Sequence, residues 1–194
     1  MFKNFLYFNS FLESLVIFFG KVGAWLSIPL MCIIIFDIIT RRFFILGSTK
    51  LQEMEWHLHT AVFLLSLGFA YIKNAHVRIE IVREKYPSIL KSIFEILGIL
   101  LFLIPYTCLI IYYGMDFVNR SYNLNEVSSA LTGLSHRWII KSFIPLGMLL
   151  LFLAGVSILL RNTLLVVARL KKDSKSLTII YEKYPELNEI KKDS

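Results

Sequence analysis

Long apolar runs, separated by short polar and charged segments, dominate the chain. Four runs, at about residues 22–40, 56–73, 89–113 and 138–160, are near the roughly 20 residues that an α-helix needs to cross a ~30 Å hydrocarbon core. Most of the charged residues stand at the ends of these runs. The pattern predicts an all-α integral membrane protein whose four transmembrane helices form one domain, residues 21–165.

The two ends of the chain have a different pattern. Within residues 1–20 the apolar side chains fall mostly on one helical arc, with polar residues such as Asn9 and Glu13 elsewhere. This spacing predicts an amphipathic helix lying at the membrane interface. Residues 166–194 are charged and have too few apolar positions for a separate domain, so we expect a charged tail with a short surface helix near residues 179–190. Because no small-x-small cleavage site follows the first apolar run, we expect an uncleaved chain.

Composition supports the membrane assignment. Of its 194 residues, 56% are hydrophobic, and its mean hydropathy is +0.64. These values are typical of a multi-pass membrane protein, and 194 residues are too few for a large transporter core. The formal charge of +7 could indicate nucleic-acid binding, but the basic residues stand at the ends of apolar segments. Membrane topology accounts for that placement, and no nucleic-acid partner is expected.

The distribution of positive charge predicts the topology. With a cytoplasmic N-terminus, 15 of the 21 Lys and Arg residues fall in inner segments and 6 in outer loops. The second run agrees, because Glu53 and Glu55 precede it while Lys73 and Arg78 follow it. Positive loops tend to stay inside, so we predict a multi-pass protein with both termini in the cytoplasm.

One charged pair lies near the end of the first run. Asp37 is the only acid well inside that run, and Arg41 lies one helical turn later on the same face. The two side chains could form a mutual ion pair that lets both approach the outer headgroups, or they could anchor a partner subunit. The sequence leaves both interpretations open.

The second run carries two adjacent rows of polar or small residues. A helix with such rows does not face lipid all round, so we expect it to contact other helices closely. The first row is Gln52, Glu55, His59, Ser66 and Lys73, and the second is Glu53, His57, Thr60 and Gly68.

Three histidines, His57, His59 and His136, fall at the predicted outer face. A bis-histidine haem or a small metal site is geometrically conceivable there. However, residues i and i+2 point to different sides of a helix, and no thiolate or third ligand accompanies them. We therefore expect interfacial hydrogen bonding by these histidines, with no cofactor and no metal. Because the sequence contains no nucleophile, metal-protease or phosphate-loop motif, we expect no enzymatic activity.

Several segments together resemble one family. They are FDIITRRFF at 36–44, LQEMEW at 51–56, FLLSLGFAYIKNAHVRIEIV at 63–82 and NEVSSALTGLSHRWIIKSFIPLG at 125–147. They are similar to the small four-helix membrane subunit of tripartite ATP-independent periplasmic (TRAP) transporters, from about residue 10 to 165. The most specific part is the run from Gly68 to Arg78, taken with the acids Glu53 and Glu55. Prolines common in the family's second outer loop are absent from residues 128–135, which leaves the shape of that loop open.

The resemblance implies a role in the bacterial inner membrane. In this family a periplasmic binding protein captures the solute, commonly an organic acid, and a large subunit carries the solute and sodium sites. The small subunit stabilises the large one and helps present a docking surface. The implied partners are the large permease subunit, the binding protein as a transient partner, and the lipid bilayer.

The family's motif positions, carried to this chain, give two sets of residues. Those expected at the partner-subunit interface are Asp37, Arg41, Arg42, Glu53, Glu55, Trp56, His76 and Arg78, to which the polar rows add His59 and Ser66. Those expected in the periplasmic docking loop are Glu126, Ser128, Gly133, Arg137 and Trp138.

Two other functions stay open at this stage. The histidines at one face would suit a membrane-anchor or haem-binding subunit of a redox complex, which an absorption spectrum would reveal. A small exporter acting as a homodimer is the third possibility. It is disfavoured because the segments containing Pro29, Pro105 and Pro145 do not form matching halves.

Overall fold

The computed structural model describes residues 2–44, 47–75, 88–130, 132–171 and 174–184. Within these ranges the regular secondary structure is helical, which confirms the all-α prediction. The elements are α1 (Phe2–Phe43), α2 (Thr49–Ile72), α4 (Ser88–Gly98), the π-helical η1 (Ile99–Leu103), α5 (Ile104–Asn123), α6 (Trp138–Leu170) and α7 (Ser174–Lys183).

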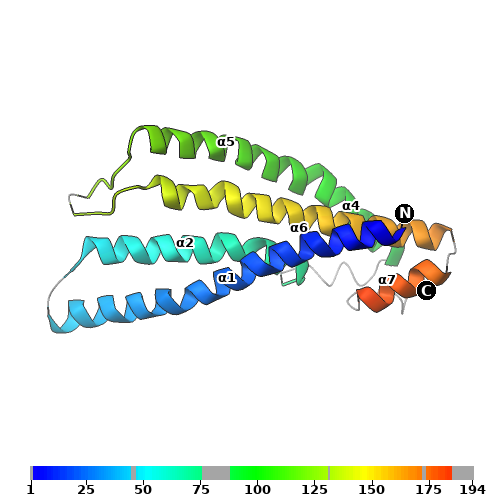
Figure 1. Cartoon of the computed structure of the whole chain (residues 1–194), viewed down its shortest axis with the longest axis horizontal. Helices are drawn as coiled ribbons and strands as arrows, with labels where there is room; N and C mark the ends of the chain where they lie inside the picture. Colours follow the sequence, from blue (N-terminus) through cyan, green and yellow to red (C-terminus); the bar gives the residue numbers. More distant parts are fainter. Residues whose placement is uncertain (1, 45–46, 76–87, 131, 172–173, 185–194) are drawn as a thin grey trace.

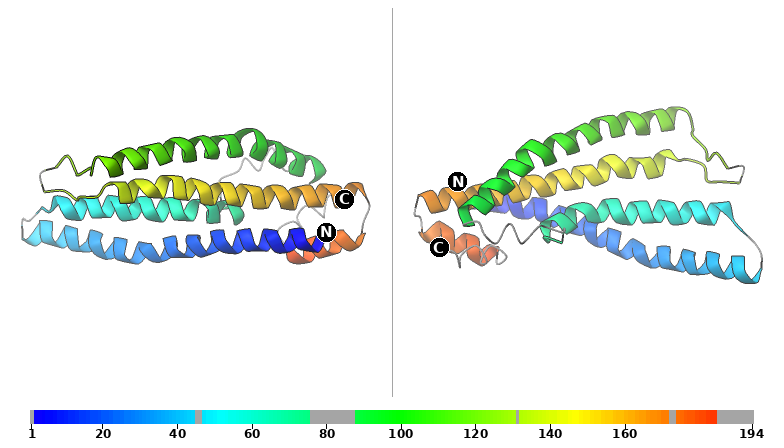
Figure 2. Two further views of the ribbon diagram at one scale, coloured as in Figure 1. Left: turned by 45° about the horizontal axis from the view of Figure 1, so that its top comes forward. Right: turned by 180° about the vertical axis from the view of Figure 1, so that it is seen from behind.

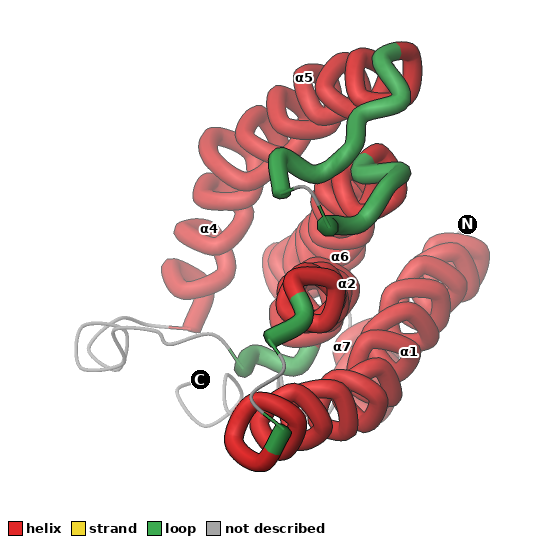
Figure 3. Tube along the Cα trace, turned by 90° about the vertical axis from the view of Figure 1, so that its left-hand side faces the viewer, coloured by secondary structure: helices red, strands yellow, loops and turns green. Residues whose placement is uncertain are grey.

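The long helices form an elongated bundle in which successive helices run in opposite directions (Figure 1). The helices pack in the order α1, α2, α6, α5, so that α2 and α6 occupy the middle (Figures 2 and 3). We call one end of the bundle the loop end, formed by residues 47–48, 124–130 and 132–137. At the opposite, terminal end, α1 and α4 begin and α7 packs (Figure 1).

Three of the described helices are long and apolar enough to cross a membrane: Phe5–Phe43, Ile89–Asn123 and Trp138–Leu170. The multi-pass membrane prediction is therefore supported, whereas four crossings remain a prediction. Of the long helices, α2 is outside this set, and its first half carries acidic and histidine side chains. These polar groups are tolerable in α2 because α1 and α6 cover it on two sides.

Helix α1 has no break where residues 1–20 were expected to form a separate interfacial helix. It runs through Pro29 for 42 residues, about 63 Å at 1.5 Å per residue, or twice the thickness of a hydrocarbon core. Its first turns pack against α6 and α7 in a cluster that contains Leu6, Leu165 and Ile180. The predicted lead-in helix is thus an extension of the first crossing helix.

A π-helical turn joins α4 to α5 into one curved helix (Figure 2). Pro105 follows this turn and lacks the N–H that would continue the α-helical hydrogen bonding, a common cause of a local widening and bend. Ile99 in this turn is buried, and a Cβ on Gly155 of α6 would lie 2.5 Å from Leu103 Cδ2. The π turn therefore places two bulky residues against α6.

Glycines allow α2 to approach both of its neighbours closely. A Cβ on Gly68 would lie 2.7 Å from the Leu150 carbonyl oxygen of α6, and one on Gly147 would lie 2.8 Å from Leu64 Cβ. On the α1 side, a Cβ on Gly23 would lie 2.8 Å from Ser66 Oγ. Small residues at these crossings let the helix backbones pack tightly, as is typical of membrane helices.

Candidate functional site at the loop end

Two polar clusters lie at the loop end, on different sides of α2. One joins Glu53 to the α5–α6 loop, and the other joins α2 to the last turns of α1. Together they contain most of the residues that the sequence predicted for partner contact and docking.

The first cluster is centred on Glu53, whose side chain is buried. Its Oε2 accepts a hydrogen bond of 2.6 Å from the backbone N–H of Leu134, and its Oε1 accepts one from the Ser128 hydroxyl. The Ser128 N–H in turn donates to the Leu134 carbonyl at 3.1 Å. One carboxylate on α2 therefore holds both sides of the α5–α6 loop.

The close approach of Ser128 and Glu53 to Gly133 leaves no room for a side chain at position 133. A Cβ at this position would lie 2.2 Å from Ser128 Cβ and 2.9 Å from Glu53 Oε1. No side chain fits between the loop and the carboxylate without moving one of them.

The base of the loop is held by a helix cap and two side-chain contacts. Asn125 has φ 44°, and the Glu126 N–H donates to the Ser121 carbonyl at 3.0 Å, the Schellman pattern that ends α5. The Glu126 carboxylate pairs with the Lys141 ammonium on α6. Trp138 stacks edge-on against Tyr122, with ring centroids 5.4 Å apart.

Hydrogen bonding keeps two carboxylates ionised, that of Glu53 on α2 and that of Glu126 in the α5–α6 loop. The Leu134 N–H, followed by the Ser128 hydroxyl, lowers the pKa of Glu53 below its ordinary value of 4.5. The Lys141 ammonium is the main cause of the lowered pKa of Glu126. Both groups are negatively charged at neutral pH, and the loop structure depends on that charge.

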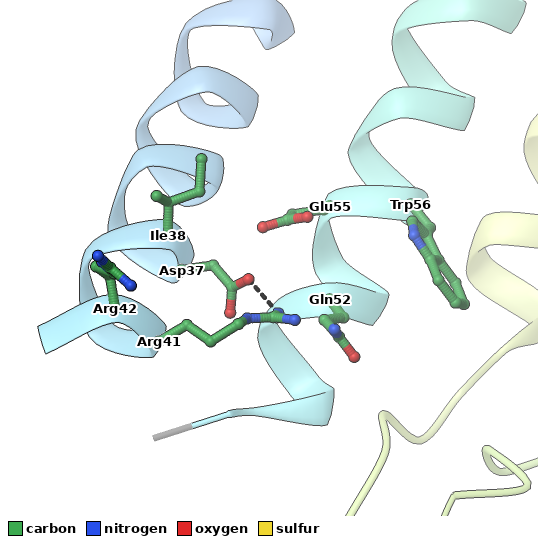
Figure 4. A pocket seen from close by; sticks show the side chains of 7 residues that line it. All are labelled: Asp37, Ile38, Arg41, Arg42, Gln52, Glu55 and Trp56. Atoms are coloured by element: carbon green, nitrogen blue, oxygen red, sulfur yellow. Dashed lines mark hydrogen bonds and ion pairs between the residues drawn. The ribbon is translucent and has the colours of Figure 1, made fainter. Parts of the chain in front are cut away.

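The second cluster lines an open cleft of about 540 Å³ between α1 and α2 (Figure 4). Arg41 pairs with Asp37, which is the first of the two arrangements that the sequence left open. With the Gln52 amide oriented so that its oxygen faces the guanidinium, that oxygen accepts hydrogen bonds from Nη1 and Nη2 of Arg41, each at 2.8 Å. Arg41 thus links the two helices. The cleft is lined by Asp37, Ile38, Arg41, Arg42, Gln52, Glu55 and Trp56.

The remaining predicted positions have different surroundings. His59 is exposed on α2, whereas Ser66 lies against Gly23 of α1. His76 and Arg78 lie outside the described residues. All five predicted loop residues lie at the loop end, where the backbone N–H of Arg137 donates to the Glu126 carbonyl at 3.2 Å.

The histidines were also considered as ligands. Among the residues that the structure describes, no group of three or more His, Cys, Asp or Glu side chains is placed to hold a metal ion. His136 has φ 61°, and its Nδ1 lies 2.9 Å from Ser135 Oγ. Its described contact is thus a local one within the loop.

A buried polar cluster at the terminal end was not predicted from the sequence. Asn9 was expected on the polar outer arc of the first helix, but it is only 1% exposed, which corrects that assignment. Its Nδ2 donates to the Tyr184 hydroxyl at 2.6 Å, and the Ser157 hydroxyl donates to Glu13 at 3.0 Å. Two polar residues of α1, Asn9 and Glu13, therefore have partners on α6 and on the residue that follows α7. The i, i+4 spacing of Asn9 and Glu13 was the only local signal.

The helical bundle and its loop-end clusters can be compared with known families. A family model described as "Tripartite ATP-independent periplasmic transporters, DctQ component" matches residues 30–164. The chain belongs to this DctQ family. The matched range contains both loop-end clusters, whereas residues 2–29 of α1 and helix α7 lie outside it. A search of curated proteins found no match to the chain.

Membership in the DctQ family establishes the general role. The chain is a membrane component of a TRAP transporter and works with the other subunits of such a system, the large permease and the binding protein. DctQ proteins are transporter components and not a known enzyme family. The apolar helices agree with a multi-pass membrane protein.

Proposed function

We propose that this chain is the accessory small permease subunit of a sodium-driven, binding-protein-dependent secondary transporter for organic acids or related solutes. It stabilises the large permease subunit and helps to form the surface on which the periplasmic binding protein docks. The observation that carries the proposal is the DctQ match over residues 30–164, which includes both loop-end clusters.

The surface of the bundle suits an accessory subunit. Helices α1 and α5 form its two edges, and each exposes large apolar side chains, such as Ile35 and Ile38 on α1 and Tyr106 and Tyr113 on α5. Such surfaces are stable against lipid or against another membrane subunit. The proposed role uses these faces for assembly and places solute transport in the large subunit.

The distribution of basic residues supports a bacterial inner-membrane topology with both termini in the cytoplasm and α2 as a fourth crossing. The six Lys and Arg residues assigned to outer loops are all at or near the loop end, at the end of α1, the start of α2, the end of α5 and the start of α6. The loop end would then face the periplasm. The docking loop comprises Glu126, Ser128, Gly133, Arg137 and Trp138.

The experiment is co-purification from cells that produce an affinity-tagged form of this chain with its large permease subunit. We expect the large subunit to elute with the tagged chain after extraction in a mild detergent. A tagged, unrelated multi-pass protein of similar length serves as the control. Elution of this chain alone, from membranes that contain both proteins, would overturn the proposal.

A further inference from the structure

The cleft between α1 and α2 has carboxylate oxygens for which the described residues supply no donor. We propose that this cleft receives a cationic side chain, a guanidinium or ammonium group, from the large permease subunit. The inference rests on the proposed function and adds the chemistry of the contact.

Asp37 is the deeper of the two acids. Its side chain is 5% exposed, and Arg41 pairs with Oδ2. The other oxygen, Oδ1, is buried and has no hydrogen-bond partner among the described residues. The carboxylate is therefore only half satisfied, although it lines an open cleft.

Glu55 presents the second oxygen from the neighbouring helix. Its Oε1 is also buried without a hydrogen-bond partner in the described part of the chain. Figure 4 shows the Asp37 and Glu55 side chains pointing into the space between α1 and α2. A buried acceptor without a donor is costly, so two acceptors in one cleft favour a donor that comes from outside the chain.

The two arginines of the cleft do not meet this need. Arg41 is engaged by Asp37 Oδ2 and by Gln52. Arg42 is exposed and lies five residues after Asp37, about 140° further round the helix. A cationic donor for Glu55 Oε1 is therefore best supplied by another protein.

Charge and shape indicate the class of donor. The formal charges of the four charged residues that line the cleft sum to zero, but Arg42 is turned away from Asp37. The remaining three, Asp37, Arg41 and Glu55, carry a formal charge of −1, which one added cation neutralises. A guanidinium has five N–H donors in a planar fork and can serve oxygens from two directions, whereas an ammonium has three donors. Ile38 and Trp56 in the cleft wall offer apolar surface to the aliphatic stem of either side chain.

The test compares three forms of the full chain in the co-purification assay: wild type, Glu55→Gln and a matched control, Glu182→Gln. Glu182 is an exposed acid on α7 at the terminal end, away from the cleft. We expect Glu55→Gln to recover roughly tenfold less large subunit, because the partner's buried cation loses one of its two carboxylate acceptors. Glu182→Gln should recover the wild-type amount.

The outcomes separate the inference from the proposed function. Failure of the wild-type chain to bring down the large subunit would refute the proposed function itself. Wild-type recovery by Glu55→Gln would overturn only the cationic contact. A Glu55 effect that appears in sodium buffer and disappears in choline buffer would also overturn it, because a free sodium ion would then occupy the cleft.

A second measurement keeps both acids intact and so does not depend on the folding of Glu55→Gln. A photoreactive amino acid replaces Ile38, which is 60% exposed beside the cleft. We expect irradiation of the assembled complex to join this position to a peptide of the large subunit that contains Arg or Lys. Crosslinks to lipid alone, or to a peptide without a basic residue, would contradict the inference.

Discussion

Glu53 and Leu134 are 81 residues apart in the sequence, yet the Leu134 N–H donates a 2.6 Å hydrogen bond to the Glu53 carboxylate. This contact crosses from the first turns of α2 to the α5–α6 loop. A loop proposed to meet a partner protein is thereby fixed in shape before the partner binds, which lowers the entropy cost of binding.

The first prediction concerns the charge of Glu53. In Glu53→Gln one carboxylate oxygen becomes an NH2 group, so the side chain can no longer accept from both Leu134 and Ser128. We expect amide hydrogen exchange at Leu134 and Ser128 to become roughly fivefold faster or more. The control is Glu55→Gln, which makes the same change two residues later on another face of α2. Equal exchange rates in wild type and Glu53→Gln would contradict the role of the carboxylate.

The second prediction is a pH dependence of the same loop. Hydrogen bonds lower the pKa of Glu53, and the Lys141 ammonium lowers that of Glu126. A lowered carboxyl pKa gives stability that is complete above the ordinary value of 4.5 and is lost as the pH falls through the folded pKa. We expect protection of the loop amides, corrected for intrinsic exchange, to be constant from pH 7 to about 5 and to decline below 4.5. Protection that stays unchanged down to pH 2 would refute this.

The third prediction concerns close packing in the middle of the bundle. Gly68→Ala places a methyl group 2.7 Å from the Leu150 carbonyl oxygen, so α2 and α6 must separate. We expect a loss of about 1–3 kcal/mol in the free energy of unfolding, measured by denaturation in detergent micelles. The control is Gly98→Ala, because the added Cβ meets no neighbour within 4 Å apart from its adjacent residues and the backbone of its own helix. That variant should be neutral or slightly more stable, since alanine favours helix.

The fourth prediction separates two adjacent arginines. Both arginines are exposed, but Arg41 links Asp37 on α1 to Gln52 on α2, whereas the Arg42 side chain has no hydrogen bond or ion pair among the described residues. Arg41→Ala removes the only described partner of a 5% exposed carboxylate, so we expect it to lower the thermal stability of the purified chain. Arg42→Ala should leave the melting temperature within about 1 °C of wild type, because exposed charges contribute little. Equal effects of the two substitutions would refute the assignment of the α1–α2 link to Arg41.

The sequence predicted the helical class and much of the loop-end chemistry because both depend on local patterns. Apolar run length identifies crossing helices. The Asp37–Arg41 pair follows from i, i+4 spacing, and the polar rows of α2 predicted close helix contacts. Ser66 lies against Gly23 of α1, and Gly68 lies against Leu150 of α6 and Val16 of α1. The family motif added the loop residues that meet at this end.

The features that the sequence did not reveal depend on contacts between distant segments. The partner of Glu53 is a backbone N–H, which has no signature in a list of side chains. Asn9 is buried because Tyr184, the residue after α7, covers it, and the spacing of Asn9 and Glu13 on α1 does not identify this distant partner. The continuity of α1 was missed because polar residues in its first turns resemble the solvent face of an interfacial helix.

The central claim is that this chain is an accessory subunit that transport requires, while another subunit carries the solute. The most direct measurement is uptake of the solute that the cognate binding protein binds, in cells that lack this chain and retain the large subunit and binding protein. We expect uptake to be lost in these cells and restored when the full chain is supplied from a plasmid. Full uptake without this chain, with normal amounts of the large subunit in the membrane, would contradict the account.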